Sequence, residues 1–205
     1  MVNSWGDYDH FLSAKIWFMK SYIEPGNTLP ILHADTNKGI INFNQQRDYH
    51  LRYVLKDVFG NQTVKEFTVR GEPEAIPAAY HPEGATPLYY AKDNHFNADG
   101  VRLNIQKGLL AKNGWLQLLH GRTYNAHSEA YSFAKAAYPL FNYAQISLKP
   151  SGAVHNPEKL YVAMRNSLNA DVPASFCGGK YAKGWVTGRM RELGCAYFLA
   201  YDDTP

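Results

Sequence analysis

Apolar and polar residues alternate on both sides of a central turn in residues 49–70. The apolar positions are Leu51, Tyr53 and Leu55 before the turn and Phe67 and Val69 after it. A period of two is that of a β-strand with one buried face. Gly60 and Asn61 tolerate the positive φ of a tight reversal, and the Asp57 carboxylate can accept hydrogen bonds from backbone N–H groups of the turn. The pattern predicts an antiparallel hairpin, with a bulge or a covered outer face at Val64, where the alternation breaks.

Short apolar stretches separated by turn residues continue through the second half of the chain. The stretches cover residues 100–105, 115–119, 144–148, 160–164, 185–190 and 196–200. Clusters of Gly, Asn, Asp, Ser and Pro punctuate them, as in antiparallel sandwiches. Residues 127–138 are rich in Ala, with Ser128 as a possible helix N-cap, but their apolar residues hold no single face. We therefore expect an irregular segment or a short helix there.

The first 48 residues and the region after the hairpin set the predicted domain boundaries. Residues 7–13 suggest a helical turn, residues 24–27 a turn, and residues 39–43 a short strand. Residues 72–77 contain two prolines and no periodicity, as an interdomain linker does. The sequence predicts an all-β chain of two antiparallel β-sandwich domains. The first covers residues 1–71, the linker covers 72–78, and the second sandwich covers 79–205.

Composition describes a globular protein, because 45% of the 205 residues are hydrophobic and 19% are charged. No window approaches the roughly 18 apolar residues of a membrane span. The start lacks the basic and apolar regions of a signal peptide, so the chain is either cytosolic or cut from a longer exported protein. The net charge is +3. The densest basic stretch, residues 180–191, has the pattern of a solvated strand face, and we expect no nucleic-acid partner.

Few residues stand at spacings that chemistry requires. His95 and Asp99 have the His-x3-Asp spacing of some zinc peptidases, but a hydrolytic zinc needs a third ligand and an activated water. The sequence contains no His-x-His, so we expect His95–Asp99 to be a turn. Cys177 and Cys195 either form a disulfide between paired strands or remain two free thiols. We assign no catalytic residue and no metal ligand, and the ligand-binding residues, like the oligomeric state, stay unknown.

Aromatic residues cluster beyond the predicted linker. They are Tyr80, Tyr89, Tyr90 and Phe96. Tyr rings commonly stack on sugars, so a glycan-binding face is one interpretation. The other is packing in a core or at a domain junction, which is the commoner use of such residues.

A series of motifs, read in order, resembles one known family. Asp57-x-x-Gly60-Asn61 between two strands looks like the last hairpin of bacterial immunoglobulin-like domains. The wider series includes Ile23-Glu24-Pro25-Gly26-Asn27, Asn37-Lys38-Gly39-Ile40-Ile41, Gly178-Gly179-x-Tyr181-x-x-Gly184-Trp185 and Arg191-Glu192-Leu193-Gly194. It is similar to the region that follows the catalytic domain in Bacteroidetes LytM-type (lysostaphin-like) zinc peptidoglycan endopeptidases.

The resemblance implies that the two β-sandwich domains are immunoglobulin-like and that the first is truncated at its N-terminus. It also implies a role without catalysis. In that family the zinc ligands lie in an upstream peptidase domain, so zinc is expected only there and this chain is expected to have no enzymatic activity. The chain would be a fragment of a periplasmic or cell-envelope protein, in which it positions or regulates the peptidase domain that acts on peptidoglycan. The alternative is a carbohydrate-binding or adhesion module of a secreted or surface protein, with the neighbourhood of Tyr80, Tyr89 and Tyr90 as its glycan-binding face.

Overall fold

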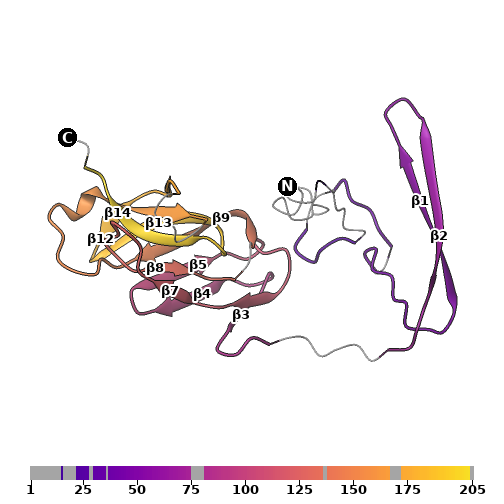
Figure 1. Cartoon of the computed structure of the whole chain (residues 1–205), viewed down its shortest axis with the longest axis horizontal. Coiled ribbons are helices and arrows are strands. Elements are labelled where there is room, and N and C mark those ends of the chain that lie inside the picture. Colours follow the sequence, from indigo (N-terminus) through magenta and orange to yellow (C-terminus); the bar gives the residue numbers. More distant parts are fainter. Residues whose placement is uncertain are drawn as a thin grey trace. The chain divides into compact units, whose positions relative to one another are not determined.

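The computed structural model describes residues 15, 22–27, 30–35, 37–74, 81–135, 138–166 and 172–203. The chain divides into two compact units, and each is described here by itself. Unit 1 comprises Met1–Lys20, Glu24–Leu32 and His81–Pro205, and unit 2 comprises Ser21–Ile23 and His33–Tyr80. Within the described ranges every sheet is antiparallel and no α-helix occurs, which confirms the all-β fold class (Figure 1). None of the described segments is a helix long and apolar enough to cross a membrane.

Unit 2 contains the predicted hairpin, formed by β1 (Asp48–Lys56) and β2 (Gln62–Arg70). The Asp57 carboxylate accepts hydrogen bonds from the backbone N–H groups of Phe59 and Asn61, each at 2.9 Å. Gly60 has a φ of 87°, as predicted, but Asn61 does not have a positive φ. The side chain of Asn61 instead donates to Asp57 Oδ2 at 2.7 Å. Neither alternative predicted at Val64 occurs, because the register runs unbroken with Val54 opposite Val64, and Val64 is exposed.

The two faces of the hairpin differ in polarity. On one face, the rings of Tyr53 and Phe67 stack with their centroids 5.7 Å apart. On the other, Arg52 pairs with Glu66 at 3.2 Å. The apolar face is largely exposed, because Tyr53, Leu55 and Phe67 keep 48%, 61% and 41% of their surface. Unit 2 thus presents an amphipathic two-stranded ribbon.

The short strand predicted at residues 39–43 is wrong. Ile40 and Ile41 are exposed and belong to no strand. Only Phe43 makes a sheet-like contact, because its carbonyl accepts a hydrogen bond from Glu72 N at 3.0 Å. A single such bond is not a ladder, so apolar side chains without a partner strand do not make β-structure.

Unit 1 is a sandwich of two five-stranded sheets. The first, here named the β9 sheet, has the order β12 (Lys180–Ala182), β13 (Trp185–Glu192), β9 (Pro139–Leu148), β5 (Val101–Ile105) and β4 (Asn94–Ala98). The second, here named the β14 sheet, has the order β11 (Ser175–Phe176), β10 (Leu160–Arg165), β14 (Ala196–Tyr201), β8 (Ala130–Ser132) and β7 (Leu119–Gly121). Strands β3 (Thr86–Leu88) and β6 (Gly114–Leu116) pair with each other in a small separate sheet. The last described element is the 3-10 helix η1 (Pro157–Lys159).

The core of unit 1 lies between the two sheets and follows the alternation seen in the sequence. Leu103 in β5 and Ile146 in β9 are opposite each other and buried. From the β14 sheet, Val162 and Leu199 join the same cluster with no exposed surface. Burying one such side chain contributes about 1.5–3 kcal/mol, so these inward positions hold the sheets together. The polar residues between them are left on the outer faces.

The remaining predictions for unit 1 met mixed outcomes. The turn at residues 24–27 is confirmed, with Asn27 N donating to Glu24 O at 2.9 Å. Residues 127–138 contain strand β8 and no described helix, because β8 pairs with β7 and β14. Residues 115–119 are not one strand but parts of β6 and β7. The helical turn predicted at residues 7–13 lies outside the described residues.

Candidate functional site

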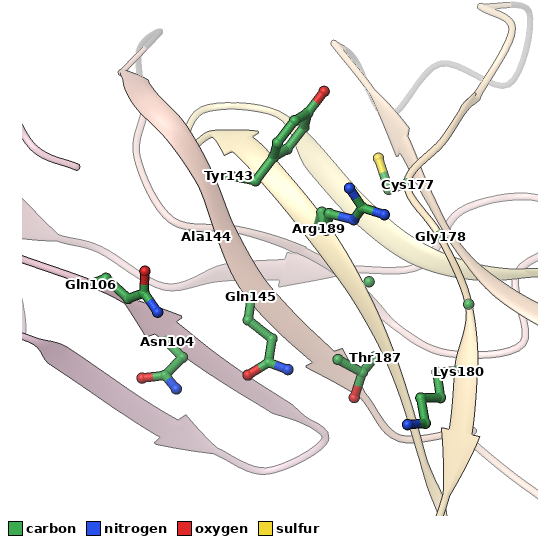
Figure 2. A pocket seen from close by; sticks show the side chains of 12 residues that line it. Asn104, Gln106, Tyr143, Ala144, Gln145, Cys177, Gly178, Lys180, Thr187 and Arg189 are labelled. Atoms are coloured by element: carbon green, nitrogen blue, oxygen red, sulfur yellow. The ribbon is translucent and has the colours of Figure 1, made fainter.

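The outer face of the β9 sheet is hollowed over strands β5, β9 and β13 (Figure 2). The hollow has a volume of about 520 Å³. Its lining combines side-chain amides, hydroxyls and two cations with a short Gly-containing segment. The residues are Asn104, Gln106, Tyr143, Ala144, Gln145, Cys177, Gly178, Gly179, Lys180, Thr187, Gly188 and Arg189.

Strand register places the polar residues of the hollow in two adjacent rows. The first row crosses three strands as Asn104, Gln145 and Arg189, which are successive cross-strand partners. In the second row Thr187 lines the hollow, and its partner Ser147 lies beside it, with their hydroxyl oxygens 2.8 Å apart. Outward side chains on neighbouring strands lie about 5 Å apart at Cβ, so one small molecule can contact several of them at once.

One rim of the hollow is a segment that passes from one sheet to the other. Cys177 N donates to Val162 O of β10 at 2.8 Å, and Cys177 O accepts from Arg189 N of β13 at 2.7 Å. Close approach of the backbones requires glycine at two positions. A Cβ at Gly179 would lie 2.6 Å from Leu160 O, and one at Gly188 would lie 2.7 Å from Cys177 O. The sequence predicted only a turn here, and the sheet crossing is what shapes the rim.

The strands of the β9 sheet carry an excess of positive charge. Their charged residues are four cations, Arg102, Lys180, Arg189 and Arg191, and one carboxylate, Glu192. Glu192 Oε1 accepts hydrogen bonds from the backbone N–H groups of Tyr138 and Gly194. The ion pairs that the described residues form include none of the four cations. Because these charges add on one face, the strands contribute positive potential over the hollow.

Aromatic rings hold three of the arginines in place. Arg102 lies over the Trp185 ring, with its Cζ 3.9 Å from the ring centroid. Arg189 and Arg191 both lie against the Tyr143 ring, at 5.7 Å and 5.2 Å. A cation–π contact uses the flat face of a guanidinium and leaves its N–H groups at the edge available. The face therefore offers oriented hydrogen-bond donors.

The two cysteines are free thiols in the structure. Cys177 is partly exposed at the hollow, and burial raises the pKa of its thiol above the ordinary value. The thiol is therefore protonated at neutral pH, which weakens it as a nucleophile. Cys195 is buried, with its Sγ 3.3 Å from Asn166 Oδ1. The sequence left open a disulfide or two thiols, and the structure contains the two thiols.

The sequence predicted that residues 95–99 form a turn, and this prediction is wrong for most of the segment. His95 belongs to strand β4, opposite Asn104, and only Asp99 lies in the turn that precedes β5. The strand extends to Asn94 because β4 pairs with the whole of β5, which the local sequence does not reveal. In the ranges that the structure describes, no three His, Cys, Asp or Glu residues are placed to hold a metal ion.

The described aromatic residues singled out in the sequence, Tyr89, Tyr90 and Phe96, do not share an exposed face. Phe96 packs against Phe133 with the ring centroids 6.4 Å apart, and Tyr90 packs against the core. Tyr89 is exposed, and Lys92 Nζ lies 4.9 Å from the centre of its ring. Tyr80 lies outside the described residues. The polar hollow was missed because its members come from strands far apart in the sequence.

Comparison with known proteins finds one family that covers both sheets and the hollow. Residues 85–202 match the model described as Zu5-like domain. No curated protein is significantly similar to the chain.

Proposed function

The chain belongs to the Zu5-like domain family, and we propose that its sandwich is a non-catalytic module that binds a carbohydrate in the hollow of the β9 sheet. The observation that carries the proposal is the row formed by Asn104, Gln145 and Arg189 beside the Tyr143 ring. Side-chain amides both donate and accept hydrogen bonds, as the neighbouring hydroxyl groups of a sugar do. A half-exposed Tyr ring adds an apolar surface on which a sugar ring can stack.

The placement of these groups favours binding without rearrangement. Asn104 and Gln145 are on strands in the interior of a five-stranded sheet, whose backbone is fixed by pairing on both sides. Binding groups on rigid strands lose little conformational entropy when a ligand arrives. The hollow is thus a preformed concave surface that presents several polar groups to a small ligand.

The chemistry of the lining supports binding rather than turnover. Hydrolysis of a glycosidic bond ordinarily needs two carboxyl groups on either side of the bond. The residues described around the hollow include no Asp and no Glu. The protonated Cys177 thiol supplies no ready nucleophile in their place. We therefore infer that a bound carbohydrate is held and released unchanged.

The resemblance to the region after the LytM-type catalytic domain adds a specific expectation. It predicts that this chain is an accessory region of a zinc peptidase that acts on peptidoglycan, located in the periplasm or cell envelope. Peptidoglycan is a glycan, so it is the first ligand to test under either interpretation. Retention on peptidoglycan supports the accessory role, whereas retention only on other polysaccharides supports an adhesion module.

The test measures binding of the purified chain to insoluble peptidoglycan and to a panel of soluble polysaccharides. The variants Asn104→Ala and Gln145→Ala each remove one amide, which contributes about 1 kcal/mol and corresponds to about fivefold in affinity. Gln62→Ala, which removes an exposed amide from β2 of unit 2, is the matched control. We expect the first two variants to weaken binding and the control to leave it unchanged. Equal affinities for all four proteins, or no binding to any polysaccharide, would refute the proposal.

A further inference from the structure

We infer that the ligand of the hollow is an acidic carbohydrate, whose carboxylate or sulfate group is bound jointly by Arg189 and Lys180. The inference rests on the proposed function and specifies its ligand class. It begins from the number of cations on this face and from their lack of ion-pair partners among the described residues.

The register brings the two cations close together. Lys180 of β12 is the cross-strand partner of Thr187, and Arg189 is two residues farther along β13. Residues two positions apart along a strand point to the same face. Lys180 and Arg189 are therefore diagonal neighbours on one face, with their Cα atoms about 7–8 Å apart. Both side chains line the hollow, the Lys180 ammonium beside Thr187 and the Arg189 guanidinium beside Cys177 (Figure 2), so an anionic group that binds both lies between them. Two cations at this spacing repel each other until an anion lies between them.

The surroundings of Arg189 leave its hydrogen-bond donors and the space above them available. The guanidinium lies near Tyr143, with its Cζ 5.7 Å from the ring centre. The segment that passes beside it contains Gly178 and Gly179, which have no side chains to fill the hollow. A guanidinium with an accessible edge binds a carboxylate or sulfate through two parallel N–H···O bonds.

The sheet itself supplies no competing anion. Its one carboxylate, that of Glu192, already accepts two backbone hydrogen bonds at the far end of β13. Arg102 and Arg191 on the same face add to the potential without entering the hollow. An anion from solution is therefore the partner that the charge distribution favours.

The number and spacing of the groups favour an acidic sugar over a nucleic acid. Nucleic-acid surfaces owe their affinity to many phosphate contacts, commonly six to ten. Here two cations line the hollow, and the amides of Gln145 and Asn104 continue the row that begins at Arg189. That order, charge at one end and hydrogen-bonding amides along the rest, matches a sugar with one acidic substituent and several hydroxyls.

The experiment compares each acidic polysaccharide with its own neutral form. The full chain is titrated with polygalacturonate and with the same polymer methyl-esterified, and with dextran sulfate and with dextran. We expect at least one acidic form to bind at least tenfold more tightly than its neutral partner at 50 mM salt. The difference should shrink at 500 mM salt, because exposed charges are screened. The two pairs of polymers show whether carboxylate or sulfate is preferred.

Variants assign the preference to the two cations. The double variant Lys180→Gln with Arg189→Gln should lose the preference for the acidic form, so that it binds the acidic and the neutral polymer equally. The charge-matched control is Lys112→Gln with Arg122→Gln, which changes two exposed cations outside the β9 sheet and should keep the preference. Arg189→Lys retains the positive charge but loses the planar guanidinium that can form two parallel hydrogen bonds, so it should keep part of the preference.

Four outcomes would overturn the inference. Equal binding of acidic and neutral forms, with Asn104→Ala still weakening both, would end this inference and leave the proposed function standing. A preference that survives in the double variant would do the same. A single-stranded 20-nucleotide DNA bound as tightly as the best acidic polysaccharide would show a general polyanion surface. Absence of binding to every polymer would overturn the proposed function together with the inference.

Discussion

Replacing Gly188 with Ala tests how the rim of the hollow is built. Gly188 lies in β13 opposite Ile146, and its Cα faces the β14 sheet. A methyl group there would meet Cys177 O at 2.7 Å and the Cβ and Cγ2 atoms of Val162 at 2.8 Å. None of these atoms is the free end of a flexible side chain. The sheets would therefore have to separate locally until these contacts reach at least 3.4 Å.

The size of the effect follows from this overlap. Forcing one extra methyl group into a packed core costs about 1–3 kcal/mol. The same shift stretches the hydrogen bond from Arg189 N to Cys177 O, now 2.7 Å, and weakening it adds up to about 1 kcal/mol. For a sandwich of this size, each kcal/mol lowers Tm by roughly 3–5 °C. We expect Gly188→Ala to lower Tm by roughly 5–15 °C and to weaken carbohydrate binding.

Urea unfolding followed by tryptophan fluorescence measures the change, with thermal melting as a second probe. The matched control is Gly121→Ala in β7, where an added Cβ would meet no atom within 4 Å. The control should stay within about 0.5 kcal/mol of the parent protein. If Gly188→Ala proves as stable as Gly121→Ala, then the close contact between β13 and β10 is not required, and the account of the rim is wrong.

Three further predictions follow from the structure. Burial, and secondarily the charge of Glu24, raises the pKa of Tyr138 to about 12. The unfolded phenol ionises near pH 10, so the unfolded chain releases its proton first and stability falls as pH rises from about 10 to 12. Urea unfolding between pH 9 and 11.5 should show this fall, and Tyr138→Phe should reduce it; an equal slope in both proteins contradicts the assignment. The exposed apolar face of the hairpin should cause association that grows with concentration and is suppressed in Leu55→Lys; a monodisperse monomer at high concentration by light scattering contradicts this. Incubated with zinc and peptidoglycan, the chain should release no muropeptides and hold no stoichiometric metal; zinc lost on His95→Ala, together with cleavage, would reveal a site.

The hairpin of unit 2 was predictable because all of its determinants are local. The alternating residues, Gly60 and the Asp57 carboxylate lie within 22 residues, from 49 to 70. Both strands and the capping hydrogen bonds of Asp57 are found as predicted. Two local details were wrong. The register runs without the bulge expected at Val64. The positive φ expected at Asn61 came from propensity, since the Asn61 side chain stabilises the turn through Asp57 instead.

Short edge strands were missed for the opposite reason. Strand β12 contains only Lys180, Tyr181 and Ala182, which show no alternation. These residues are extended because β13 offers a partner, and Lys183 and Gly184 take positive φ values of 50° and 80° in the two-residue turn between them. Residues 39–43 show the converse, because their apolar side chains find no partner strand. Pairing, which the local pattern does not encode, decides both cases.

The candidate site in the hollow could be predicted only in part from the sequence. Alternation alone indicates that Asn104, Gln145 and Arg189 point outward, since each stands between two inward residues. Their meeting in one row depends on the order β5-β9-β13, which links residues about 40 positions apart along the chain. Because the outward row carries the charge and the inward residues carry the packing, the two can be changed independently. The variant with Gln at positions 180 and 189 should therefore unfold at the same urea concentration as the parent protein. Gly188 is the exception, since one atom added there changes the core and the rim together.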